Sequence, residues 1–124
     1  MVALCAALCL AGCSSGPKDP TTGWSVGKIQ AEAKAEREAG NFDKAVTLLE
    51  KLEGRAAGTP IAQQAQLDKA YAHFKAAEVA QAEATLDRFM QNHPASPAID
   101  YALYLKGLTS FNDNLGMFGF LSRQ

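Results

Sequence analysis

Apolar residues recur every three to four positions along most of the chain, which is the spacing of one face of an α-helix. The clearest stripe runs from Phe42 to Leu52, with charged and polar residues between its members. The same spacing returns in three later stripes: Leu67, Ala70, Tyr71 and Phe74, then Ala82, Leu86, Phe89 and Met90, and finally Tyr101, Tyr104, Leu105, Leu108 and Phe111. The pattern therefore predicts an all-α fold.

Residues that start and stop helices agree with these stripes. Thr59-Pro60 and Ser96-Pro97 each place a hydroxyl residue at an N-cap before a proline at the first helical position. Gly40-Asn41 supplies a stop followed by a cap. Because the intervening turns are short, consecutive helices must pack antiparallel as helical hairpins. We expect helices at about 24–39, 42–54, 60–76, 79–92 and 97–112.

The hairpins repeat each other in sequence. Aligning residues 42–45 with residues 79–82 superposes Leu49 on Leu86 and Leu52 on Phe89. The offset is slightly above the 34-residue period of a tetratricopeptide repeat, and the turn at 54–59 can absorb the excess. The chain therefore resembles tandem tetratricopeptide-repeat hairpins that form part of a right-handed superhelical solenoid. A generic alanine-rich helical bundle without superhelical order is the alternative.

Five positions have residue types that the repeat needs for packing its helices and for ending them. A small residue is needed where the two helices of a hairpin approach most closely, an aromatic residue fills the space against the next repeat, a glycine stops a helix and a proline closes the unit. These residues are Gly40, Ala45, Ala82, Phe89 and Pro94. We expect repeat 1 at 24–57, repeat 2 at 58–95, and the first helix of a third repeat within 96–124.

The first ten residues are apolar throughout and have about the length of a signal-peptide core, shorter than the roughly 20 residues of a membrane-spanning helix. Leu10-Ala11-Gly12-Cys13 follows, and it resembles the lipobox of bacterial lipoproteins. We therefore expect a lipoprotein signal peptide at 1–12 and covalent diacylglycerol and N-acyl lipid on Cys13. The first charged residue is Lys18, so the positive n-region is missing and the sequence is expected to start inside the signal peptide.

The alternative for the N-terminal cysteines, Cys5, Cys9 and Cys13, is that they are small hydrophobic residues of a buried or membrane helix. The residue after Cys13 is Ser14, whereas lipoproteins retained in the inner membrane commonly carry aspartate there. We expect an anchor in the outer membrane, on its periplasmic face. Residues 13–23 are small, polar and rich in proline and glycine, and are predicted to form a flexible tether.

Charge and motif content argue against several classes of function. Twelve Lys plus Arg residues balance 13 Asp plus Glu residues, which gives no clustered basic surface for nucleic acid. His73 and His93 lie too far apart in sequence to form a metal-ligand pair. No phosphate loop, dinucleotide fingerprint or nucleophile motif is present. We expect that the protein is not an enzyme and that it binds no metal and no cofactor apart from the covalent lipid.

Four segments of the sequence resemble one particular family of repeat lipoproteins. They are Gly40-Asn41-Phe42 followed by Ala45, then residues 63–68, residues 86–89 and residues 99–109. Together they resemble the BamD (ComL) family, lipoprotein subunits of the outer-membrane β-barrel assembly machinery. Members of this family carry more repeats than this sequence, which stops at Gln124. Because residues 115–121 resemble the start of an insertion in the family, the resemblance implies a C-terminally truncated sequence.

The resemblance implies a non-enzymatic subunit that scaffolds the β-barrel assembly complex and recognises client peptides. The implied partners are the barrel-forming subunit, other lipoproteins of the complex and unfolded outer-membrane β-barrel proteins. Two other functions fit a repeat lipoprotein. One is a pilotin-like escort for secretin assembly, and the other is a regulator of peptidoglycan enzymes.

A peptide groove is expected on the wall formed by the first helix of each repeat. The expected ligand is a short strand ending in an aromatic residue and a free carboxylate, so the groove needs apolar pockets and a few donors. The candidates are the amphipathic side chains Tyr71, His73, Tyr101 and Tyr104 and the cations Lys69 and Lys106. Alternatively, most of the aromatic residues are inter-helix core, and only their hydroxyl ends reach the groove.

Overall fold

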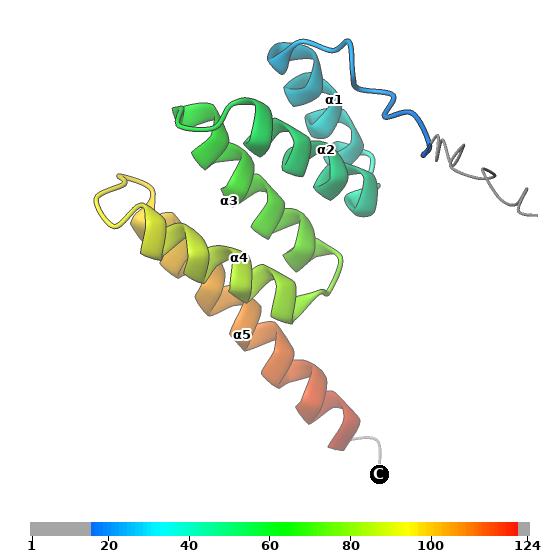
Figure 1. Cartoon of the computed structure of the whole chain (residues 1–124). Helices are drawn as coiled ribbons and strands as arrows, with labels where there is room; N and C mark the ends of the chain where they lie inside the picture. The colour runs from blue at the N-terminus through cyan, green and yellow to red at the C-terminus, as the bar shows by residue number, and fades with distance from the viewer. Residues whose placement is uncertain (1–15, 122–124) are drawn as a thin grey trace, which may run out of the picture.

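The computed structural model describes the backbone of residues 16–121 and the side chains of residues 16–116. This part of the chain contains five helices and no strand: α1 (Val26–Glu38), α2 (Phe42–Arg55), α3 (Pro60–Lys75), α4 (Val79–Asn92) and α5 (Ile99–Leu121). The helices stack in chain order from α1 to α5, each against its neighbour (Figure 1). This arrangement confirms an all-α tandem helical-repeat fold. The predicted signal peptide and Cys13 lie outside the described residues.

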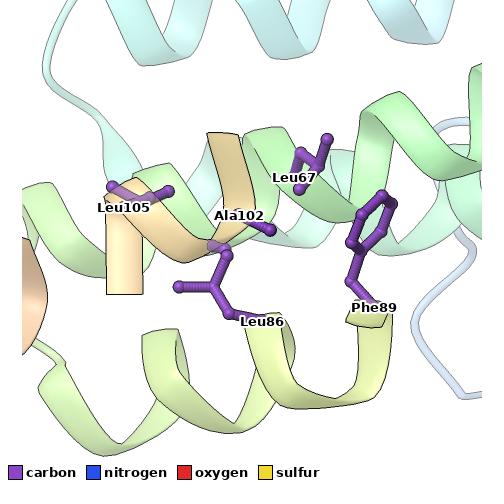
Figure 2. Close-up of a cluster of buried hydrophobic side chains, with 6 residues drawn as sticks. Leu67, Leu86, Phe89, Ala102 and Leu105 are labelled. Carbon is purple, nitrogen blue, oxygen red and sulfur yellow. The ribbon is translucent and has the colours of Figure 1, made fainter. Parts of the chain in front are cut away.

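Two clusters of buried apolar side chains hold the stack together. The first joins α1 and α2 to α3 through Ile29, Ala33, Leu49, Leu52 and Ala65. The second joins α3 and α4 to α5 through Leu67, Ala70, Leu86, Phe89, Ala102 and Leu105 (Figure 2). Each hairpin therefore completes its core only with the first helix of the next one, which couples the hairpins in a line.

The two clusters use equivalent positions of the repeat. Ala33, Leu49, Leu52 and Ala65 each lie 37 residues before a member of the second cluster, namely Ala70, Leu86, Phe89 and Ala102. Ala45 and Ala82, also 37 residues apart, are both fully buried near the start of their helices. The predicted structural roles of Ala45, Ala82 and Phe89 agree with this burial, and Pro94 lies in the turn after α4.

The α1–α2 turn is a Schellman motif, in which a left-handed residue lets two N–H groups reach back to the end of the helix. Gly40 has φ +81° and donates its N–H to the Arg37 carbonyl at 3.2 Å. The N–H of Asn41 donates to the Glu36 carbonyl at 2.8 Å. The expected helix stop at Gly40 is thus confirmed.

The α3–α4 turn repeats this motif without a glycine. Ala77, 37 residues after Gly40, has φ +60° and donates its N–H to the Phe74 carbonyl at 3.1 Å. The N–H of Glu78 donates to the His73 carbonyl at 2.9 Å. Because Ala77 carries a Cβ in the left-handed region, the second turn is strained where the first is not.

The predicted helix caps are only partly correct. Thr59 and Asn41 occupy the N-cap positions of α3 and α2, but neither side chain caps its helix. The Thr59 hydroxyl donates backward to the Ala56 carbonyl at 2.5 Å, and the Asn41 amide donates to a Glu36 carboxylate oxygen at 2.6 Å. The side chains bond backward because the preceding helix ends leave acceptors within reach. α5 begins at Ile99, two residues later than predicted.

Helix α5 is longer than the sequence predicted. We expected it to end near residue 112, but it continues to Leu121 and includes residues 115–121, which resembled the start of an insertion. Several large apolar side chains on it are exposed: Tyr101, Leu103, Tyr104, Phe111 and Leu115. Tyr104 and Phe111 lie 37 residues after Leu67 and Phe74, which pack in the second cluster. The residues exposed on α5 therefore occupy repeat positions whose equivalents in α3 are packed against other helices.

The expectation of a flexible tether as far as residue 23 is wrong for its last part. Thr21 is 1% exposed, and Asp19 accepts hydrogen bonds from its N–H and hydroxyl at 2.9 and 2.8 Å. Arg55 donates to the carbonyl oxygens of Thr21 and Trp24, each at 2.6 Å, and Lys51 pairs with Asp19. We call these five residues the N-terminal clasp. The sequence did not reveal it because the cations come from α2, more than 30 residues away.

Replacing Ala77 with glycine should stabilise the fold by about 0.5–1 kcal/mol, because relief of the left-handed strain exceeds the entropy that glycine loses on folding. We expect Tm to rise by a few degrees in thermal unfolding followed by circular dichroism. The control is Ala76→Gly, where φ is −79° and glycine should lower Tm. A Tm for Ala77→Gly that falls as it does for Ala76→Gly would contradict strain at this turn.

The clasp should open in acid. The hydrogen bond from Lys51, and after it the N–H of Thr21, hold the pKa of Asp19 well below its ordinary value. A depressed pKa gives stability that is present above the ordinary pKa of 3.8 and is lost as the pH falls below it. Trp24 is the one tryptophan, so its fluorescence reports on the clasp. Asp19→Asn should give at pH 7 the emission that the unmodified chain shows only in acid, whereas the control Asp100→Asn should not.

Candidate peptide-binding groove

A groove of about 550 Å³ lies across the first helices of successive hairpins. Its lining begins with Arg37 and Glu38 at the end of α1 and with Gly40 and Phe42 where α2 starts. It continues with Asp68, Tyr71 and Lys75 on α3 and with Tyr101 near the start of α5. We call it the tyrosine groove. Because α1, α3 and α5 are separate in sequence, the groove exists only when the hairpins are stacked.

An ion pair organises the floor of the tyrosine groove. A guanidinium nitrogen of Arg37 lies 2.7 Å from a carboxylate oxygen of Asp68, and the amide of Gln64 donates to the same oxygen at 3.0 Å. The Arg37 guanidinium also lies 5.9 Å from the centre of the Tyr71 ring, within the range of a cation–π contact. Arg37 therefore fixes both a carboxylate and an aromatic face.

Tyr101 provides the most accessible aromatic surface of the groove, with 43% of the residue exposed. Partial burial raises the pKa of its phenol above the ordinary value, and the negative charge of Asp68 raises it further. The hydroxyl therefore stays protonated at neutral pH and is able both to donate and to accept a hydrogen bond. Beside it, Tyr71 packs its ring 6.3 Å from the ring of Phe74, so Tyr71 is partly core.

The structure brings together only two of the predicted aromatic residues, Tyr71 and Tyr101. Tyr104 is 61% exposed on α5 and does not line the tyrosine groove. His73 is mostly buried, and its Nδ1 lies 2.6 Å from a carboxylate oxygen of Glu78 at the α3–α4 turn. This contact gives His73 a structural place beside the Schellman motif.

Neither predicted cation lies in the tyrosine groove. Lys69 is 5% exposed and its Nζ lies 2.7 Å from a carboxylate oxygen of Glu53. It projects about 200° around α3 from Tyr71, since each helical residue turns the direction by about 100°. Lys106 pairs with Asp87 of α4. Both are engaged in ion pairs between hairpins.

The cations that do line the groove, Arg37 and Lys75, were missed by sequence reasoning. Arg37 stands among Lys34, Glu36 and Glu38, and such a mixed run is typical of a solvated helix face. Lys75 is exposed in the last turn of α3, where a cation is also favoured by the helix dipole. Within the described part of the chain Lys75 makes no ion pair, so its charge is available to a ligand.

Two further observations concern residues 16–121 as a whole. No cluster of three or more histidine, cysteine, aspartate or glutamate residues among them could hold a metal ion. None of their helices is both long enough and apolar enough to cross a membrane.

Stacked helical hairpins with equivalent cores 37 residues apart define a repeat protein of the tetratricopeptide class. The family model described as tetratricopeptide repeat matches residues 19–123, almost the whole described part. The chain belongs to the tetratricopeptide-repeat family.

Within that class the chain is similar to proteins named outer membrane protein assembly factor BamD. It is 46% identical over 104 residues to the protein from Neisseria meningitidis serogroup B, a match that covers 84% of this chain and 39% of the relative. The proteins from Vibrio cholerae and Haemophilus influenzae are 34% and 32% identical over 81% and 86% of this chain, and the matches cover 41% and 40% of those relatives. The resemblance to the BamD family is thus confirmed, and the chain spans about two fifths of the length of these relatives.

Proposed function

We propose that this chain is a non-enzymatic lipoprotein that acts in the assembly and insertion of β-barrel proteins into the outer membrane. The relatives' shared name, assembly factor BamD, gives the process. The observation that supports this chain's own part in that process is the tyrosine groove, where Tyr71 and Tyr101 lie beside Lys75. The two carboxylates of the groove, Glu38 and Asp68, are already paired with Lys34 and Arg37. Its role is to recognise client peptides while the stacked hairpins scaffold the complex.

The groove fits a strand that ends in an aromatic residue and a free carboxylate. The rings of Tyr71 and Tyr101 offer apolar faces for the aromatic side chain. Lys75 provides the charge for the carboxylate, because Arg37 is already neutralised by Asp68. The hydroxyl of Tyr101 supplies one donor and one acceptor for the backbone of such a strand.

The anchor and partners complete the proposal. Cys13 carries the diacylglycerol and N-acyl lipid and holds the chain on the periplasmic face of the outer membrane. Asp19, the first residue of the clasp, follows Cys13 by only six positions, so the backbones of these two residues lie at most about 20 Å apart. The pairing of Asp19 with Lys51 therefore keeps α2 close to the lipid anchor. The partners are the barrel-forming subunit, other lipoproteins of the complex and unfolded β-barrel proteins.

Replacing Tyr101 with alanine should weaken binding of a short strand-forming peptide that ends in phenylalanine by about tenfold, because a half-buried aromatic anchor is lost. Fluorescence anisotropy of the labelled peptide with the full-length chain measures this change. Tyr104→Ala is the matched control, since it removes an exposed tyrosine of the same helix outside the groove. We expect the affinity of this variant for the peptide to stay within about twofold of that of the unmodified chain.

The role of the Lys75 charge is tested with the same peptide in two forms, one with a free C-terminal carboxylate and one with an amidated C-terminus. Lys75→Gln should abolish the preference for the free acid, whereas Lys34→Gln, on the exposed side of α1, should leave it intact. Equal effects of Tyr101→Ala and Tyr104→Ala, or no preference for the free acid in the unmodified chain, would overturn recognition by the tyrosine groove.

Cys13→Ser should move the protein from the membrane to the soluble periplasmic fraction, because a serine cannot carry the lipid. Fractionation of cells that express the full-length chain measures this directly. The control is Cys9→Ser, in the predicted signal peptide, which should leave the protein at the membrane. Retention of Cys13→Ser in a strain that lacks the assembly complex would contradict the lipid anchor.

A further inference from the structure

A second groove, of about 630 Å³, lies between the C-terminal ends of α2 and α4, with α3 as its floor. We call it the outer groove and define it by Glu50, Glu53, Gln66, Lys69 and His93. Gln66 and Lys69 belong to a different face of α3 from Asp68, Tyr71 and Lys75. The outer groove is therefore separate from the tyrosine groove, and the proposal below does not depend on the function assigned to that site.

Gln66 is the unusual residue of the outer groove. It is only 3% exposed, yet its side-chain amide forms no hydrogen bond among the described residues. No side-chain nitrogen or oxygen in this part of the chain is both sealed from solvent and without a partner. The amide nitrogen and oxygen therefore keep a small contact with solvent, and because Gln66 lines the groove, two N–H donors and a carbonyl acceptor are unused at its floor.

The charged side chains around this amide favour a cation. Lys69 is neutralised by Glu53 at 2.7 Å. Glu50, one helical turn before Glu53, is exposed and makes no ion pair within the described part of the chain. Glu50 and Glu53 against the one ammonium of Lys69 leave these three side chains with one net negative charge.

We propose that the outer groove binds an extended peptide segment of a partner protein that carries a lysine or arginine. A side-chain amide matches a peptide group in both directions, because it donates to the C=O and accepts from the N–H of the same backbone. Gln66 therefore holds the backbone at the floor of the groove. The basic side chain of the segment pairs with Glu50 and with the free oxygen of Glu53 at the α2 rim.

The probe is the capped peptide acetyl-Gly-Lys-Gly-Gly-amide, titrated into the full-length, ¹⁵N-labelled chain in detergent micelles. We expect nuclear magnetic resonance shifts at the Gln66 side-chain amide and at the backbone amides of Gly58 and Ala62, which line the groove. The peptide with glutamate in place of lysine should bind about three- to fivefold more weakly. No shift at Gln66, or equal binding of the two peptides, would overturn the proposal.

Two matched pairs of variants separate binding from folding. Gln66→Met keeps the length of the side chain but removes the amide, and should weaken binding of the lysine peptide about fivefold. Gln30→Met, on the exposed face of α1, should leave that binding unchanged. Glu50→Gln should remove the lysine preference, and Asp100→Asn, an exposed carboxylate of α5 outside both grooves, should retain it. Unfolding curves of Gln66→Met exclude a global effect. Shifts that depend on protein concentration without peptide would assign the groove to a second copy of the chain and overturn the proposal.

Discussion

The closure of each hairpin's core by the first helix of the next hairpin is the constraint on which the rest of the structure depends. Ala65 of α3 completes the cluster of α1 and α2, and Ala102 of α5 completes that of α3 and α4. Both positions are small, so the incoming helix lies close against Leu52 or Phe89. A single hairpin would leave these residues exposed, and burial of a leucine or phenylalanine is worth about 1.5–3 kcal/mol.

The same closure creates the two grooves. Because α3 packs against α2 on one side and α4 on the other, two of its remaining strips form part of the lining of the grooves. One strip carries Asp68 and Tyr71 and meets Arg37 and Tyr101 from the neighbouring first helices. The other carries Gln66 and Lys69 and lies between the ends of α2 and α4. A change in the packing of α3 would therefore alter both grooves together.

Ion pairs between hairpins follow the core. Lys69 reaches back to Glu53 and Lys106, 37 residues later, reaches back to Asp87. In each case a cation of a first helix meets a carboxylate of the preceding second helix, so the contact recurs with the repeat. These pairs are local consequences of the stacking. They explain why the two lysines predicted from the sequence as ligand partners are already occupied.

The sequence by itself determined the fold class, the repeat, its buried small residues and the approximate ends of α1 to α4, because these follow from local periodicity and turn chemistry. It did not determine the end of α5, which continues to Leu121. Of the four aromatic candidates on first helices, Tyr71 and Tyr101 line the tyrosine groove, whereas His73 and Tyr104 do not. Only the tertiary structure decided which charges meet. Arg37 and Asp68, or Arg55 and the backbone of Thr21, are about 30 residues apart, and nothing in a charged helix face shows which of its residues another helix will cover. Side-chain pairing depends on the angle and register of stacking, which the linear pattern does not contain.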